Sequence, residues 1–222
     1  MAKEFYNCSL KSGSFSIEFT NACNSACKGN TFGLIGNING FEMTDGQINS
    51  FYKEMFKFLN NGNKIHYYIT EIYQEEIKKN SRAKYLIEHA NTTIHNIVDW
   101  NNIGGDMPKF QGVVMNPPFC NGLHLKILET VMEHIDWEHD GKIVCIHPAK
   151  WLQFPTRERP AFMNGYIKDF TIVDRREANS TFDIDDSDMV ITELGQNGLS
   201  FTGKLTEDPI FNCFKFNPKF TF

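Results

Sequence analysis

The sequence predicts an α/β fold with a central, mostly parallel β-sheet and helices on both faces. Short apolar runs rich in β-branched residues alternate with amphipathic helical segments along much of the 222 residues, which is typical of a parallel sheet. Several of these apolar runs are also followed by a polar side chain at the point where the strand should end. The length fits one domain, or one domain with a small appendage.

The first expected helix covers residues 44–59, with Thr44 and Asp45 as its N-cap region. The run Asn-Asn-Gly-Asn at 60–63 should stop it. Residues 1–43 are rich in Gly, Asn and Ser, and we expect an irregular, divergent N-terminal segment there. The apolar positions of the helix recur at helical spacing: Ile48, Phe51, Tyr52, Met55, Phe56 and Leu59.

The rest of the chain predicts further strands and helices in alternation. Residues 149–165 are expected to form a loop with a short helix, and 174–188 a polar, acidic connection. The predicted strands cover 65–69, 92–98, 112–115, 142–146, 167–173 and 189–194, and the predicted helices cover 74–89 and 123–135.

Four of these strands are followed by a polar side chain: Glu71, Asp99, Asn116 and His147. In open α/β sheets, ligands bind in the crevice beyond the carboxyl ends of the strands. The sequence therefore predicts a ligand site formed by these four positions together.

The tetrapeptide Asn116-Pro117-Pro118-Phe119 ends the apolar run 112–115. The two prolines remove two N–H donors, so the Asn116 side-chain oxygen and the Pro117 carbonyl can accept hydrogen bonds from an amino group. Phe119 can stack on a flat base that carries that amino group. The alternative interpretation is a strand that ends in a Pro-Pro turn, with Phe119 in the core.

Two acidic positions suit a nucleoside. Glu71 lies where a carboxylate can accept hydrogen bonds from a ribose, and the alternative is a solvated carboxylate at a strand end. Asp99 can accept from the amino group of an adenine, and Trp100 offers an aromatic face. The alternative for this pair is a helix-capping Asp and a core Trp.

The ordered set Glu71, Asp99 and Asn116–Phe119 resembles class I S-adenosylmethionine-dependent methyltransferases. The Asn-Pro-Pro-Phe form resembles the amino-methylating branch, chiefly the N6-adenine DNA methyltransferases. Residues 109–119 are similar to the catalytic-motif strand of that family, 142–152 to its next strand and loop, and 167–194 to its terminal antiparallel strand pair.

This resemblance implies a Rossmann-like methyltransferase fold with a C-terminal antiparallel strand pair. The implied division of the chain is a methyltransferase-like domain over 44–194 and a short C-terminal extension over 195–222, after the N-terminal segment 1–43. It also implies S-adenosylmethionine as the cofactor. Asn116, Pro117, Pro118 and Phe119 would hold the target base, and the residues implied in cofactor binding are Glu71, Ile72, Asp99, Trp100 and Gly36.

The family's cofactor loop is a Gly-rich turn ahead of the helix that leads to the ribose-binding acid. Residues 31–40 contain glycines but no acidic residue followed by Gly-x-Gly. Gly36 and Gly40 can supply a divergent version, or the loop is lost.

The segment 17–30 resembles the iron–sulfur loop of radical S-adenosylmethionine enzymes. Cys23 and Cys27 occupy two of the three ligand positions, but Asn30 occupies the third, so we expect no cluster there. We expect no other metal site either. The two cysteines have no nearby His pair for zinc, and the acidic residues at 183–188 fit a solvated loop.

Basic and aromatic residues are interleaved after the His147 strand, and we expect Lys150, Trp151, Arg157 and Arg159 to contact a nucleic acid. An ordinary charged loop is the alternative. The net charge of −5 argues against tight unaided binding to phosphates. The C-terminal extension is smaller than the target-recognition region usual in the family it resembles, so the expected sequence specificity is either short or supplied by a protein partner. The six scattered cysteines and the lack of a membrane span or signal peptide predict a cytoplasmic protein.

Three functions remain open from the sequence. The first is methyl transfer to adenine N6, chiefly in DNA with RNA as the alternative nucleic acid. The second is a methyltransferase-like module that has lost catalysis and binds nucleic acid or protein. The third is methylation of a protein glutamine or an RNA base. The intact Asn-Pro-Pro-Phe favours the first, and the divergent glycine loop and the negative net charge favour the second.

Overall fold

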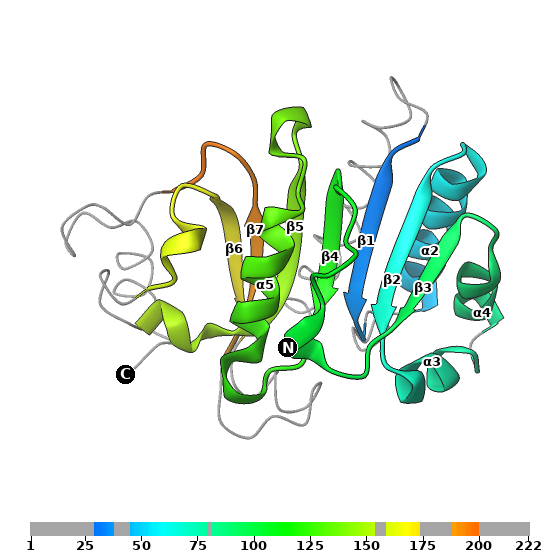
Figure 1. Cartoon of the computed structure of the whole chain (residues 1–222), viewed down its shortest axis with the longest axis horizontal. Coiled ribbons are helices and arrows are strands. Elements are labelled where there is room, and N and C mark those ends of the chain that lie inside the picture. Colours follow the sequence, from blue (N-terminus) through cyan, green and yellow to red (C-terminus); the bar gives the residue numbers. More distant parts are fainter. Residues whose placement is uncertain (1–28, 38–44, 80, 154–158, 174–187, 200–222) are drawn as a thin grey trace.

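The computed structural model describes residues 29–37, 45–79, 81–153, 159–173 and 188–199. Within this part of the chain a seven-stranded sheet has the order β3-β2-β1-β4-β5-β7-β6 (Figure 1). Its strands are β1 (Thr31–Gly36), β2 (Lys64–Ile69), β3 (Thr92–Asn96), β4 (Gly112–Asn116), β5 (Lys142–Pro148), β6 (Ile167–Val173) and β7 (Met189–Leu194).

Strands β1 to β5 are parallel to one another, and β7 runs antiparallel to both β5 and β6. The chain builds outward from β1 in one direction through β2 and β3, and in the other direction through β4 and β5. A doubly wound sheet binds its ligands where the strand order reverses, which here is between β1 and β4. The predicted fold class is confirmed as a Rossmann-like, mostly parallel sheet with a C-terminal antiparallel strand pair.

Helices cover both faces of the sheet, as the sequence predicted. Helices α2 (Asp45–Asn60), α3 (Glu71–Ile77) and α4 (Ser81–Glu88) contribute to one apolar cluster, which includes Met55 and Leu86. Helix α5 (Leu123–Glu133) contributes Ile127 and Leu128 to a second cluster on the opposite face. In Figure 1, α5 crosses in front of the sheet and α2 lies behind it.

Strand β1 is the main correction to the expected architecture. We expected residues 1–43 to be irregular, yet Thr31–Gly36 pairs with β2 on one side and β4 on the other. The sheet therefore begins earlier in the chain than residue 44. Two glycines in six residues obscured the strand pattern, since glycine weakens strands in general. At Gly33 the glycine has a packing reason, because an added Cβ would lie 2.9 Å from the Val113 Cγ2 atom.

Several predicted boundaries also moved. The single helix expected over 74–89 is two helices, and the first of them already begins at Glu71. Glu71 therefore lies in the first turn of α3, two residues beyond the end of β2. Strand β3 ends at Asn96, whereas β5 extends to Pro148 and includes His147. The predicted strands at 167–173 and 189–194 are confirmed.

Some predictions concern residues outside the described ranges. These are Thr44 as part of the N-cap, Gly40 of the glycine loop, Cys23 and Cys27, and most of the acidic connection. No helix among the described residues is long and apolar enough to cross a membrane.

Candidate functional site

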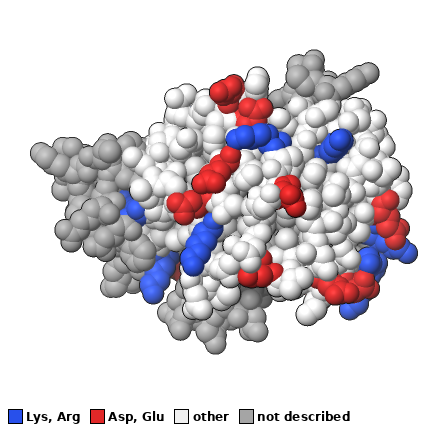
Figure 2. All heavy atoms as spheres, viewed as in Figure 1, with Lys and Arg blue, Asp and Glu red and all other residues white. Residues whose placement is uncertain are grey.

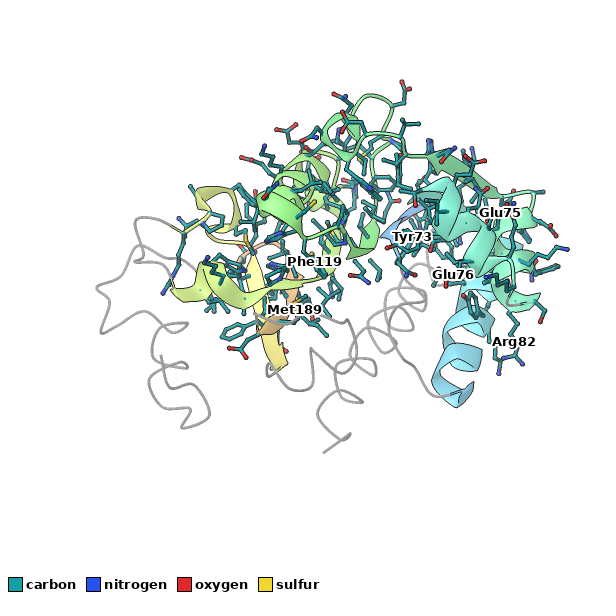
Figure 3. The ribbon with its side chains drawn as sticks, turned by 90° about the horizontal axis from the view of Figure 1, so that it is seen from below. Tyr73, Glu75, Glu76, Arg82, Phe119 and Met189 are labelled. Atoms are coloured by element: carbon teal, nitrogen blue, oxygen red, sulfur yellow. The ribbon has the colours of Figure 1, made fainter. Side chains whose placement is uncertain are left out.

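The carboxyl ends of β1 and β4 meet at the point where the strand order reverses. Gly36, the last residue of β1, is paired in register with Asn116, the last residue of β4. Figure 3 views this edge of the sheet from below, with Phe119 on one side and Tyr73 of α3 on the other. The Asn-Pro-Pro-Phe tetrapeptide therefore begins where a doubly wound fold binds ligands.

Gly36 lets the two strand ends approach closely. Its φ angle is 81°, in the left-handed region, and an added Cβ would lie 2.0 Å from the Asn116 carbonyl oxygen. Only glycine fits both conditions without strain. The structure thus gives Gly36 a role in holding the site together, and its predicted contact with a cofactor stays a prediction.

The Asn116 side chain is held in one orientation by the backbone that follows β1. Its Nδ2 donates to the Asn37 carbonyl oxygen at 2.8 Å, and the residue is only 9% exposed. A carbonyl can only accept, so the amide nitrogen must face Asn37 and the Oδ1 atom must face away from it. Among the described residues Oδ1 has no hydrogen-bond partner, so it remains an acceptor for a ligand. Sequence reasoning missed Asn37, because a backbone carbonyl leaves no signal in the sequence.

Phe119 is half-buried and packs against the apolar cluster that contains Met189. In Figure 3 the two side chains lie near each other at this edge. The alternative interpretation, that Phe119 is a core residue, therefore describes only the buried part of this side chain. The exposed remainder can contact a base.

A second group of side chains projects into solvent at the ends of β2 and β3. Glu71 is exposed, and Ile72 is 80% exposed although it is apolar. Val98, just beyond the end of β3, is 96% exposed. The Ile97 N–H donates to the Ile69 carbonyl at 2.9 Å, so the ends of β2 and β3 lie side by side. Large exposed apolar side chains near an acidic residue suit the faces of a nucleoside. Sequence reasoning missed Val98, whose signal was an apolar residue directly before Asp99.

Asp99 is engaged in local hydrogen bonds. Its Oδ1 accepts from the Asn101 backbone N–H at 3.0 Å and from the Asn101 side chain at 2.9 Å, and its Oδ2 accepts from Asn102 at 2.8 Å. The two bonds from Asn101, first the one from its backbone N–H, lower the pKa of Asp99. Trp100 is half-buried against the α5-side cluster. The alternative interpretation, a helix-capping Asp and a core Trp, describes the observed contacts of this pair.

His147 closes the β5 end of this edge and is fully buried. Trp151 donates its indole N–H to His147 Nδ1 at 3.2 Å, and His147 Nε2 lies 3.0 Å from the Thr192 hydroxyl. Burial, with the nearby His124 adding to it, lowers the pKa of His147 to about 3. At neutral pH this ring is uncharged and is not poised to act as a general base.

We expect the stability of the fold to depend on pH through His147. The pKa of His147 is about 3 in the folded state and about 6.5 in an unfolded chain. Below pH 6.5 the unfolded chain therefore binds a proton that the folded protein does not, so the free energy of unfolding is highest above pH 6.5 and falls as the pH drops toward 3. Between pH 7 and pH 5 the free energy of unfolding should fall by about 2 kcal/mol more in the wild type than in His147→Asn. Urea unfolding at both pH values measures this, and equal falls in the two proteins would contradict the buried neutral ring.

The four residues expected to contact nucleic acid do not form one surface. Lys150 is exposed, but Trp151 is only 2% exposed and Arg159 only 4%. The side chains of Trp151 and Arg159 are therefore buried and do not offer a surface to a nucleic acid. Arg157 lies outside the described residues. On the face that carries α5, basic and acidic side chains are interspersed (Figure 2). No cluster of three or more potential metal ligands occurs among the residues that the structure describes.

Comparisons with known proteins find distant similarity in fold alone. No protein-family model matches the chain, and no curated protein matches it.

TrmN from Thermus thermophilus is 11% identical to this chain, with a TM-score of 0.47. The match covers 88% of this chain and 53% of TrmN, so the chain spans about half of that protein. An O-methyltransferase from Brevibacillus brevis, solved with S-adenosyl-L-homocysteine, is 11% identical with a TM-score of 0.47, over 89% of this chain and 77% of that one. An rRNA methylase from Streptococcus thermophilus is 9% identical with a TM-score of 0.44, over 82% of this chain and 95% of that one. Similarity this distant does not assign an activity to the chain.

Proposed function

We propose that this protein transfers a methyl group from S-adenosylmethionine to the exocyclic N6 amino group of adenine in DNA. The observation that carries the proposal is the arrangement of Asn116 at the reversal point of the sheet. Its amide nitrogen is tied to the Asn37 carbonyl at 2.8 Å, so its oxygen is held ready as an acceptor beside two prolines and a partly exposed Phe119 ring.

The cofactor side of the proposal rests on the neighbouring strand ends. Glu71 would accept hydrogen bonds from the cofactor ribose, and the exposed side chains of Ile72 and Val98 would contact the adenine ring. Asp99 accepts two local hydrogen bonds on Oδ1 and one on Oδ2, so Oδ2 keeps an acceptor site for a further donor. When bound, S-adenosylmethionine supplies an electrophilic methyl group. Residues 38–44, which follow Asn37, lie outside the described ranges, so the methionine end is left without assigned residues.

The chain's own residues would act by positioning and by accepting hydrogen bonds. The N6 nitrogen of adenine is a poor nucleophile, since its lone pair is delocalised into the ring. Acceptance of its two N–H bonds by the Asn116 Oδ1 atom and the Pro117 carbonyl draws the lone pair out of that delocalisation. The Phe119 ring would stack on the base and fix its distance from the methyl donor. Transfer would release S-adenosylhomocysteine, and the proton that N6 loses would go to water, since His147 is too weak a base to accept it at neutral pH.

Cofactor binding is the first test of the proposal. Titration with S-adenosylhomocysteine in a calorimeter should show binding by the wild type. We expect Glu71→Gln to weaken it about tenfold, because a charge-assisted hydrogen bond contributes about 1.5–3 kcal/mol. Glu129→Gln, on an exposed position of α5, is the matched control and should bind like the wild type. No binding at millimolar ligand would rule out the enzyme.

Substrate class is tested with a radiolabelled methyl donor. Labelled S-adenosylmethionine is offered separately with unmethylated DNA, with RNA and with a protein extract, and the product is digested and identified by mass spectrometry. The proposal predicts N6-methyladenine from the DNA arm. Label only in RNA, or on protein glutamine, would move the activity to the other substrate class.

The second candidate function is a binding module without catalysis. The observation that favours it is the Asp99 carboxylate, which already accepts three local hydrogen bonds and so offers an adenine fewer acceptor sites than a free carboxylate would. The absence of a Gly-x-Gly pattern in residues 31–40 points the same way. This candidate predicts that the protein retains nucleic acid or a protein partner in a pull-down while the calorimeter shows no S-adenosylhomocysteine binding.

A further inference from the structure

A buried polar cluster lies directly behind the Asn-Pro-Pro-Phe tetrapeptide. It consists of His124 from α5, His147 from β5, Trp151 from the short 3-10 helix Ala149–Gln153, and Thr192 from β7. All four are at most 7% exposed. Burying polar side chains costs free energy unless they are hydrogen-bonded. Apolar side chains would fill this part of the core at a lower cost, so the hydrogen bonds of these four residues indicate a further role.

The back of this cluster is fixed by its hydrogen bonds. Because Trp151 donates to His147 Nδ1, the neutral imidazole carries its proton on Nε2 and donates to the Thr192 hydroxyl at 3.0 Å. The His147 and Trp151 rings are also stacked, with centroids 5.8 Å apart and planes 9° apart. Both ring nitrogens of His147 are therefore engaged, which leaves the ring little freedom to rotate.

The front of the cluster is His124, which contacts Phe119 twice. Its Nδ1 lies 3.3 Å from the Phe119 carbonyl, and because that oxygen can only accept, Nδ1 is the donor. Its ring also meets the edge of the Phe119 ring, with centroids 6.1 Å apart and an interplanar angle of 80°. The His124 ring also contacts the His147 ring, with the two ring centroids 5.8 Å apart. His124 thus links Phe119 to the fixed part of the cluster.

The segment that carries Phe119 needs such an anchor. Asn121 and Gly122, which follow it, have φ angles of 51° and 73°, so the chain turns sharply between β4 and α5. Within the turn, the Leu123 N–H donates to the Cys120 carbonyl. Phe119 lies at the N-cap of the short 3-10 helix Cys120–Gly122, where no side chain caps the helix, and the His124 ring adds a hydrogen bond to its carbonyl.

We propose that His124 is a positioning residue: it fixes the carbonyl and the ring of Phe119, so that the ring is held in one orientation against the target base. The other two residues of the cluster hold the His147 ring, which packs against His124 and limits its movement. This inference rests on the proposed function, in which Phe119 stacks on adenine. Misplacement of a reacting group by about 1 Å can reduce a rate about 100-fold, so the effect of losing the anchor should be measurable.

The kinetic test compares two replacements of His124. His124→Asn places an amide nitrogen close to the position of Nδ1 and retains a donor, whereas His124→Leu fills similar space without one. We expect His124→Leu to lower kcat for adenine methylation about 10- to 100-fold and His124→Asn to restore most of it. Affinity for S-adenosylhomocysteine should stay within about twofold in both. His139→Asn, on an exposed position, is the control and should retain wild-type kcat.

A second measurement does not depend on activity. Hydrogen exchange of a peptide covering residues 117–123 should be faster in His124→Leu than in the wild type, and close to wild type in His124→Asn. Equal kcat and equal exchange in all three proteins would overturn the proposal, and so would a parallel loss of cofactor affinity in His124→Leu. If the wild type transfers no methyl group but the exchange difference is found, the proposed function fails while the anchor of Phe119 stands.

Discussion

Replacing Asn116 by alanine is expected to lower kcat at saturating S-adenosylmethionine by about 10²–10³-fold, the range found when one preorganised polar group of an active site is removed. The side-chain oxygen is the proposed acceptor for the adenine amino group, and the bond from Nδ2 to the Asn37 carbonyl at 2.8 Å fixes its direction. Alanine removes both. Measured rates of N6-methyladenine formation, with folding checked by thermal unfolding, give the result.

Asn116→Asp separates the two roles of this side chain. Aspartate keeps an acceptor oxygen but cannot donate to the Asn37 carbonyl when ionised. We therefore expect its kcat to lie between those of the wild type and Asn116→Ala. If the alanine variant retains more than about a tenth of the wild-type kcat, Asn116 is not the acceptor that the proposed function requires.

Gly36→Ala is expected to destabilise the fold by about 2–5 kcal/mol, the sum of two separate penalties. A left-handed φ costs a non-glycine residue about 1–2 kcal/mol, and overpacking adds about 1–3 kcal/mol. The φ angle of Gly36 is 81°, and the new Cβ would lie 2.0 Å from the Asn116 carbonyl oxygen. The ends of β1 and β4 would have to separate at the site itself. Urea unfolding of the variant and the wild type measures the loss.

The chain offers a matched control for this prediction. Gly62 has nearly the same φ angle, 84°, but an added Cβ there would meet no atom within 4 Å. Gly62→Ala should therefore show only the backbone penalty of about 1–2 kcal/mol. Equal losses of stability in the two variants would contradict the close approach of β1 and β4.

Much of the fold could be predicted because its elements are local patterns. The apolar runs of β4 to β7 and the spacing in α2 and α5 were sufficient to place those elements to within two residues. Strand β1 was missed, since its glycines are there for contacts with Val113 and Asn116 that are about 80 residues away in sequence. Contacts of that range leave no periodic pattern around the glycines themselves.

The candidate site was predicted in outline and corrected in detail. Four side chains were expected together near the carboxyl ends of the strands, and the parallel pairing of β1 to β5 brings those ends to one edge. The sequence did not reveal that Asp99 caps the turn after it, or that Trp151 and Arg159 are buried. Exposure depends on which elements pack against a residue, and a basic or aromatic residue type is compatible with either outcome.

The sequence by itself determined the class of this fold and the chemistry of the Asn-Pro-Pro-Phe tetrapeptide, because hydrophobic periodicity and proline stereochemistry act over a few residues. Only the tertiary structure decided which way the Asn116 amide faces, what holds Phe119, and which apolar side chains stay exposed at the ends of β2 and β3. Those features depend on Asn37, His124 and Val98, which belong to other elements of the chain. They are brought to the site by the pairing of strands and the packing of α5, whose free energy comes from burial of the whole core.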